Sequence, residues 1–175
     1  MSRAARLLWG CAGLAALVFL ALFGVSKGML EPAGMVIFDS RVWGYEPDEA
    51  RRYLDGLDNM LLGRSTYLGI FRALDTVFPL LLTICLSGAI WLNTFCWNRV
   101  VRGAAALVPA AYLWADLSEN AIVAQMVRAG STVSDEVVRH ASGLTQLKWA
   151  MLACGAMVLL VTWRFACART EGQTR

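Results

Sequence analysis

The chain has 175 residues, of which 58% are hydrophobic and 17% are charged, and its formal net charge is +3. The hydrophobic fraction lies above the range of soluble domains and the charged fraction lies below it, so the composition argues against a water-soluble globular protein and favours a membrane protein. The small net charge and the absence of a basic run argue against a nucleic-acid-binding protein.

The first apolar segment covers residues 7–25 and contains no charged residue. A helix of that length rises about 28 Å, which matches the hydrocarbon core of a bilayer. Arg3 and Arg6 precede the segment, as they would in a signal peptide. However, the apolar run is longer than that of a signal peptide and ends in LFGVSKG, a poor cleavage site. We therefore expect an uncleaved first span.

A long loop, residues 26–75, follows the first span and contains the sequence EPDEARRYLDGLDNMLL. Pro47 at a favoured first position, with Asp48 and Glu49 in the first turn, predicts an amphipathic helix over about 47–62. Its apolar stripe consists of Ala50, Tyr53, Leu54, Leu57 and Leu61. The helix either lies on the membrane surface or packs onto the spans, and packing is the preferred interpretation.

The second apolar segment covers residues 76–97, with Pro79 close to its start. Proline has no amide proton, so Pro79 leaves the carbonyl group of Asp75, four residues earlier, without its helical donor. Two structures remain possible, a kink beside Asp75 or a proline in the first turn of the helix. We prefer the second.

The third and fourth apolar segments cover residues 103–127 and 144–163. Asp116 and Glu119 interrupt the third, and Lys148 is the only charged residue of the fourth. An alternative is that DLSEN breaks the third helix and lies nearer the membrane interface, but residues 103–117 alone are too few to cross a bilayer. Between these spans, Ser134 is expected to start a short helix within the loop 128–143.

The predicted fold class is therefore all-α: a polytopic four-helix transmembrane bundle in one domain, residues 1–175, with short amphipathic helices in the outer loops. Four spans place both termini on one side. The terminal segments and the loop 98–102 are dense in arginine (Arg3, Arg6, Arg99, Arg102, Arg164, Arg169 and Arg175), whereas the two longer loops are not. Because basic residues concentrate in cytoplasmic segments, we expect cytoplasmic termini in the plasma (inner) membrane.

The acidic residues of the third span lie on one face. At 100° per residue, a single stripe contains Pro109, Tyr112, Asp116, Glu119, Asn120 and Val123, whereas Ser118 points away. A stripe this polar is unfavourable against lipid, so it is expected to face the bundle interior or a hydrated cavity.

Polar residues of the neighbouring spans are expected at the same depth. Lys148 lies about 7 Å below the outer end of the fourth span, beside Thr145 and Gln146. The expected cluster consists of Asp75, Tyr112, Asp116, Glu119, Asn120, Thr145 and Lys148, with Arg64 and Arg72 as secondary members. We expect an ion pair between Lys148 and Glu119. Asp116 is expected to be protonated or hydrogen-bonded to Asn120 and Tyr112.

Two explanations of this cluster remain open. Buried polar groups can serve only to fix the register and orientation of helices. Ionisable residues inside a membrane bundle are also the usual components of binding sites and proton relays.

Three sequence stretches resemble an uncharacterised group of small bacterial four-span integral membrane proteins: GRSTYLGIFRALDTVFPLLL (63–82), PAAYLWADLSEN (109–120) and LTQLKW (144–149). The group shows G-R, then L-D-x-x-[FY]-P, D-x-x-E-N and T-x-x-K-W. The matching positions are Arg64, Asp75, Pro79, Asp116, Glu119, Asn120, Thr145, Lys148 and Trp149. The resemblance covers about two thirds of the chain. It implies the four-span fold and the cluster but no activity.

No cofactor or metal site is expected. The five cysteines (Cys11, Cys85, Cys96, Cys154 and Cys167) lie in or beside apolar segments without a C-x-x-C motif, so they are expected to pack as small apolar side chains. His140 is the only histidine, which argues against a histidine-based metal centre. The sequence also lacks a nucleophile–base motif and a phosphate-binding loop, which argues against an enzyme.

The preferred function is a non-enzymatic membrane protein, in contact with the lipid bilayer, whose cluster binds a protein partner or a lipid headgroup. The first alternative is a small proton-linked transporter or carrier, acting as a homodimer because four spans are few for such a protein. The second is an intramembrane enzyme that uses Glu119 or Asp116 as a general acid or base on a lipidic substrate.

Overall fold

The structure is a computed structural model that describes residues 2–172, with the side chains of Ala33 and residues 165–172 left aside. Arg175 and the side chains of Cys167 and Arg169 therefore lie outside the described part. Within it the chain is helical and contains no strand. Four helices are long and apolar enough to cross a membrane, which confirms this part of the predicted fold class.

The four long helices are α1 (Arg3–Val25), α4 (Arg72–Asn93), α5 (Arg99–Ala129) and α6 (Asp135–Gly172). Local sequence explains where two of them begin. The side chain of Ser2 accepts a hydrogen bond from the amide of Ala5, and that of Asn98 accepts one from the amide of Val100. Each oxygen satisfies an amide that has no partner in the first turn of a helix. A π-helical turn, η1 (Ser26–Leu30), extends α1.

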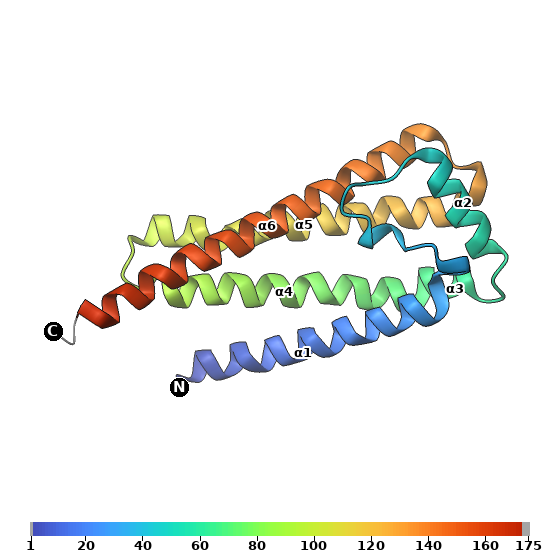
Figure 1. Cartoon of the computed structure of the whole chain (residues 1–175). Coiled ribbons are helices and arrows are strands. Elements are labelled where there is room, and N and C mark those ends of the chain that lie inside the picture. The colour runs from blue at the N-terminus through green and yellow to red at the C-terminus, as the bar shows by residue number, and fades with distance from the viewer. Residues whose placement is uncertain (1, 173–175) are drawn as a thin grey trace.

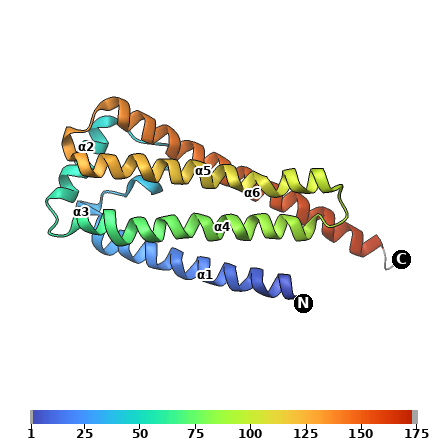
Figure 2. The same ribbon diagram turned by 180° about the vertical axis from the view of Figure 1, so that it is seen from behind.

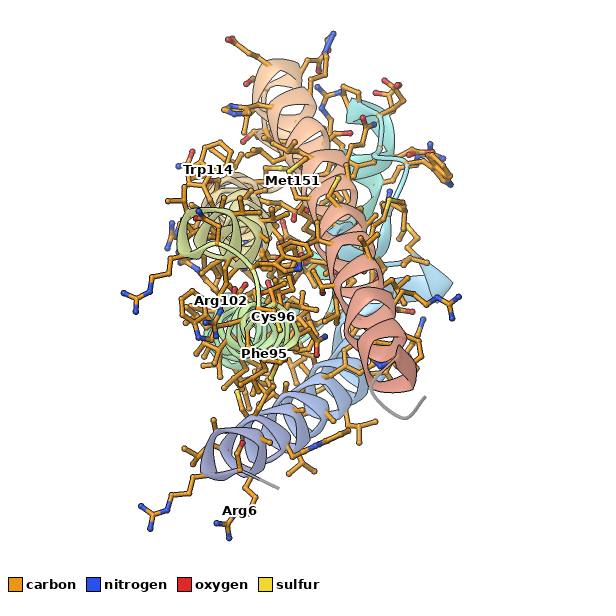
Figure 3. All side chains as sticks on the ribbon, turned by 90° about the vertical axis from the view of Figure 1, so that its left-hand side faces the viewer. Arg6, Phe95, Cys96, Arg102, Trp114 and Met151 are labelled. Atoms are coloured by element: carbon orange, nitrogen blue, oxygen red, sulfur yellow. The ribbon has the colours of Figure 1, made fainter. Side chains whose placement is uncertain are left out.

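Helices α1, α4 and α5 lie side by side with α4 in the middle, and α6 runs obliquely across α5 (Figure 1; Figure 2). Helix α4 contacts the other three, and the most extensive contact joins α5 to α6. Both termini and the α4–α5 loop lie at one end, and the short helices α2 (Pro47–Asp58) and α3 (Gly63–Thr66) lie at the other. Seen from the end with the termini, Arg6 points away from the bundle (Figure 3).

The second long helix begins earlier than the sequence analysis predicts. Residues Gly63–Asn93 are continuously helical, through α3, a π-helical turn η4 (Tyr67–Phe71) and α4. The expectation of a loop up to residue 75 and of a span up to 97 is therefore wrong. A charge-free run marks only the most apolar part of a helix, whereas here the buried side chains of Tyr67 and Phe71 hold the preceding turns in place. Pro79 consequently lies in the helix interior and not in its first turn.

The third and fourth long helices also exceed their predicted bounds. Helix α5 runs unbroken through Asp116 and Asn120, which excludes a helix break at DLSEN. Helix α6 begins at Asp135, so the separate short helix predicted in the loop 128–143 is wrong, because its residues form the first turns of α6. The turn η5 (Gly130–Thr132) joins α5 to α6, and Gly130 has a φ of 63°, which favours glycine.

Helix α2 forms as predicted at its start but ends at Asp58 instead of residue 62. Glu46 and Glu49 make a reciprocal capping box around Pro47. The stripe Ala50, Tyr53, Leu54 and Leu57 is buried against the end of the bundle, as expected for packing onto the spans. The prediction that Leu61 belongs to this stripe is wrong. Because the helix has already ended, its side chain leaves the helical register and is 98% exposed.

An aromatic core joins α2 to the segment before it. The ring of Phe38 packs against Tyr53 and Tyr45, with centroids 4.7 and 4.8 Å apart, and the guanidinium group of Arg41 lies over all three rings. The Tyr53 hydroxyl donates a hydrogen bond of 2.7 Å to the carbonyl of Leu30. Burial raises the pKa of Tyr53, because the charged phenolate would lose its hydration.

Leu57 and Leu61 provide a matched test of this end of the fold. Leu57 is fully buried, so Leu57→Ala should lower the free energy of unfolding by about 2–5 kcal/mol. The exposed Leu61→Ala should change it by no more than about 0.5 kcal/mol. Reversible unfolding in detergent micelles measures both. Equal effects of the two substitutions would contradict the observed end of α2.

Candidate functional site: the buried Lys148 cluster

Lys148 is the centre of a buried ion-pair network. Its ammonium nitrogen lies 2.5 Å from Asp39 Oδ1, 2.5 Å from Glu119 Oε2 and 3.5 Å from Asp116 Oδ1. The side chain of Lys148 is 6% exposed, and those of its partners are 13%, 0% and 5% exposed respectively. We call these four residues, together with Asn120 and Thr145, the Lys148 cluster.

Helical spacing on α5 and α6 brings most of the cluster together. Asp116, Glu119 and Asn120 occupy one turn of α5 and are all buried, as are Pro109, Tyr112 and Val123 of the same predicted stripe. The Asn120 side-chain amide donates a hydrogen bond of 3.2 Å to Asp116 Oδ2. On α6, the hydroxyl of Thr145, three residues before Lys148, is hydrogen-bonded to Glu119 Oε1.

Asn120 also satisfies a backbone group that Pro79 leaves without a partner. The second hydrogen bond of its side-chain amide, 3.2 Å long, goes to the carbonyl oxygen of Asp75. This carbonyl is the one that loses its helical donor to Pro79, because a proline at position i cannot donate to the carbonyl at i−4. A buried carbonyl without a donor is costly, so the amide of Asn120 stabilises both the proline-containing helix α4 and its contact with α5.

Asp39 is the member of the cluster that the sequence analysis missed. It lies in a short 3₁₀ turn, η3 (Phe38–Ser40), which belongs to the segment between α1 and α2. Its carboxylate binds Lys148 and its carbonyl accepts a hydrogen bond of 3.1 Å from Trp149 Nε1. The available signal was a single acidic residue, followed by Ser40 and Arg41, in the mainly apolar stretch MVIFDSRVW, but no local pattern says which helix such a residue contacts.

Two further contacts hold this segment against α6. Gln146 Nε2 donates a hydrogen bond of 2.8 Å to the carbonyl of Trp43, and the amide of Tyr45 donates one of 2.8 Å to Ser142 Oγ. Gly44, between Trp43 and Tyr45 in the chain, has a φ of 80°. A Cβ at this position would lie 2.5 Å from Ser142 Oγ. Only glycine allows this close approach. Gln146 therefore binds the loop rather than the cluster.

The remaining predicted residues take other positions. Tyr112 is buried, but among the described contacts it makes no hydrogen bond to Asp116, contrary to one of the expected arrangements. Asp75 contributes its carbonyl group, and its half-buried carboxylate takes part in none of the ion pairs of the described residues. Arg64 lies outside the cluster and binds Asp58 through two hydrogen bonds of 2.9 and 2.7 Å. Arg72 is half-buried and makes no ion pair within residues 2–172.

In the Lys148 cluster one ammonium group pairs with three carboxylates, so the fully ionised cluster carries an excess of negative charge. Tyr45, in the segment before α2, lies close enough to the cluster to be affected by its charge. Burial raises the pKa of Tyr45, and the negative charge of Glu119 raises it further. Buried negative charge without a matching positive charge is unfavourable, so the cluster favours the uptake of a proton or another cation.

Comparisons of the chain with protein families, with curated proteins and with solved structures give no match. The resemblance to small bacterial four-span proteins therefore stays a prediction.

The role of Asn120 can be tested through Pro79. Asn120→Ala removes the donor to the Asp75 carbonyl and should lower the free energy of unfolding by about 1–3 kcal/mol. Pro79→Ala supplies a backbone amide for the same carbonyl, so the cost of Asn120→Ala should be smaller in that background. Unfolding of the four variants in detergent measures this difference. An equal cost in both backgrounds would refute the compensation.

The ion pair of Lys148 and Glu119 can be tested by a double-mutant cycle with Lys148→Met and Glu119→Gln. Lys148→Met leaves three buried carboxylates without their cation and should cost about 3–5 kcal/mol. Glu119→Gln leaves Lys148 paired with Asp39 and Asp116 and should cost less, and the cycle should return a coupling energy of about 0.5–3 kcal/mol. The control cycle uses Lys27 and Glu31, a Lys–Glu pair with a half-exposed lysine, where about 0.3–0.5 kcal/mol is expected. Similar coupling in the two cycles would contradict a special role for the buried pair.

Proposed function

We propose that the chain is an integral membrane protein with four spans and cytoplasmic termini. Large apolar side chains are exposed along the long helices, among them Leu7, Trp9, Leu107 and Leu160. Such a surface is unfavourable in water and suits a bilayer. The arginine-rich segments 1–6, 98–102 and 164–175 contain one acidic residue, Glu171, which supports a cytoplasmic position for this end of the bundle.

Arg102 and Trp91 support a membrane boundary at the same end. The guanidinium group of Arg102 donates hydrogen bonds of 3.1 and 2.9 Å to the carbonyl of Trp91, and it lies 3.7 Å from the centroid of the Trp91 ring. Tryptophan and arginine are both common at the level of lipid headgroups. Figure 3 shows Arg102 near Phe95 and Cys96, at the loop between α4 and α5.

Within this membrane protein, the function that the geometry supports best is proton-linked transport, with the Lys148 cluster as the proton-binding site. The observation that carries this proposal is the ratio of three carboxylates to one ammonium group in a buried network. An isolated charge near the centre of a bilayer costs about 2.5–3.5 kcal/mol on insertion scales, so the uptake of a proton relieves part of that cost. In proton-linked carriers, buried ionisable residues that gain and lose protons form the proton-binding site.

The geometry favours this function over binding of a partner or a headgroup by the cluster itself. Asp116, Glu119, Asn120 and Lys148 bind one another, and the side chains that surround the ammonium group are at most 13% exposed. An incoming protein or lipid would find few of their polar atoms accessible. In a proton-linked carrier, only protons and water have to reach the polar atoms of the cluster.

A second candidate function, binding of a partner or lipid, has support at another place. A shallow, open hollow of about 560 Å³ lies at the turn between α2 and α3, lined in part by Leu57, Leu62 and Leu68. Leu61 and Leu62 beside it are 98% and 58% exposed, and the ion pair of Asp58 and Arg64 forms its polar side. An apolar hollow with a polar edge is typical of sites that bind an acyl chain or an apolar side chain.

Proton-linked activity can be measured on the full chain reconstituted in liposomes. An imposed pH gradient should drive proton flux that Glu119→Gln slows by about 100-fold or more, because the glutamine keeps the shape of the side chain but cannot bind a proton. Asp116→Asn should slow it as well. Glu31→Gln, outside the cluster, serves as the control. Unchanged flux in both cluster variants would overturn the proposal.

A further inference from the structure

Asp39 differs from the other carboxylates of the Lys148 cluster in its solvent exposure and in the element of the fold that carries it. Its side chain is 13% exposed, whereas those of Asp116 and Glu119 are 5% and 0% exposed. It also comes from a 3₁₀ turn between α1 and α2, whereas the other two come from the long helix α5. Among the ion-paired carboxylates of the cluster, Asp39 therefore has the most contact with solvent.

The contacts of Lys148 form a continuous path from Asp39 to the interior. Its ammonium nitrogen lies 2.5 Å from Asp39 Oδ1 on one side and 2.5 Å from Glu119 Oε2 on the other. At both contacts the nitrogen and the carboxylate oxygen lie close enough for a proton to pass directly, with no water between them. Asp116, 3.5 Å from the same nitrogen, forms a branch of this path.

The backbone around Asp39 is held by contacts with α6 and with the aromatic core of α2. Trp149 Nε1 binds the Asp39 carbonyl, and the neighbouring Phe38 is fully buried in the aromatic core of α2. Opening of the whole segment would expose that core. Hydration and rotation of one partly exposed side chain require much less rearrangement.

We propose that Asp39 is the residue through which protons pass between solvent and the Lys148 cluster. This inference rests on the proposed proton-linked function and adds the route by which the site is loaded. Other ionisable groups around Asp39 are Asp75 from α4, Asp116 from α5, and the tyrosines Tyr45, Tyr53 and Tyr67. The nearest cation is the ammonium group of Lys148, 2.5 Å from Asp39 Oδ1.

The proton reaches Glu119 in three successive transfers. A hydronium ion gives a proton to Asp39 Oδ1 and leaves as water. The ammonium group of Lys148 passes a proton to Glu119 Oε2, so that an N–H bond breaks and an O–H bond forms. The proton on Asp39 then moves to the neutral amine of Lys148. Asp39 and Lys148 return to their starting states, and one proton has moved from water to Glu119.

The test is the rate of proton uptake by the reconstituted full chain after a pH jump, followed with a pH dye and with the infrared C=O band of a protonated Glu119. Asp39→Asn should slow uptake by about 100-fold, because the amide cannot bind and release the proton. The Glu119 band should still develop at long times. Asp39→Glu should restore most of the rate, since it returns a carboxylate to the path.

Asp135→Asn is the matched control, because Asp135 is exposed and ion-paired but belongs to the Arg51 and Arg139 pairs and not to the cluster. It should leave the rate unchanged. Asp39→Ser carries the same expectation as Asp39→Asn and replaces it if the asparagine variant does not fold, as judged by its elution profile and helix content.

The outcomes separate the two proposals. A wild-type rate in a folded Asp39→Asn or Asp39→Ser variant, or a rate in Asp39→Glu as slow as in Asp39→Asn, overturns the role of Asp39 alone. Absence of a Glu119-dependent uptake in the unmodified protein overturns the proposed function, and the inference with it.

Discussion

The ammonium group of Lys148 imposes the main constraint on this structure. A lysine charge removed from water needs several close anionic or hydrogen-bonding partners, because burial costs it the hydration that water supplied. The chain meets this need with Asp39, Asp116 and Glu119, which approach the nitrogen from two parts of the sequence. The relative positions of α5, α6 and the segment before α2 all depend on these contacts. A shift of any one of them would leave a buried charge without its partner.

Buried backbone groups also need a hydrogen-bonding partner. Pro79 removes a hydrogen bond from the interior of α4, and the freed carbonyl of Asp75 accepts a bond from Asn120. Asn120 simultaneously binds Asp116, so the repair of the proline-containing helix and the orientation of a cluster carboxylate share one side chain. Polar networks in a low-dielectric interior are stable only when each member finds a partner. The proline and the asparagine are therefore best understood as a pair.

The two ends of the bundle differ in their chemistry. At the end with the termini, Arg102 binds the carbonyl of Trp91. At the opposite end, basic residues bind acidic ones, as Arg51 binds Asp48 and Arg64 binds Asp58. The Lys148 cluster lies beneath the segment that joins α1 to α2, with Asp39 as its most exposed carboxylate. In the proposed membrane orientation, protons would reach the site from the extracytoplasmic side.

Local features of the sequence determined four long apolar helices and the buried stripe around Asp116 on α5. Composition and helical periodicity decide these features within a few turns of chain. Only the tertiary structure decided that α4 is preceded by helix from Gly63, that Leu61 leaves the stripe of α2, and that Asp39 binds Lys148 across 109 residues. The physical reason is that helix ends and ion pairs of this kind depend on which distant side chains cover a backbone or neutralise a charge. No local period encodes that information.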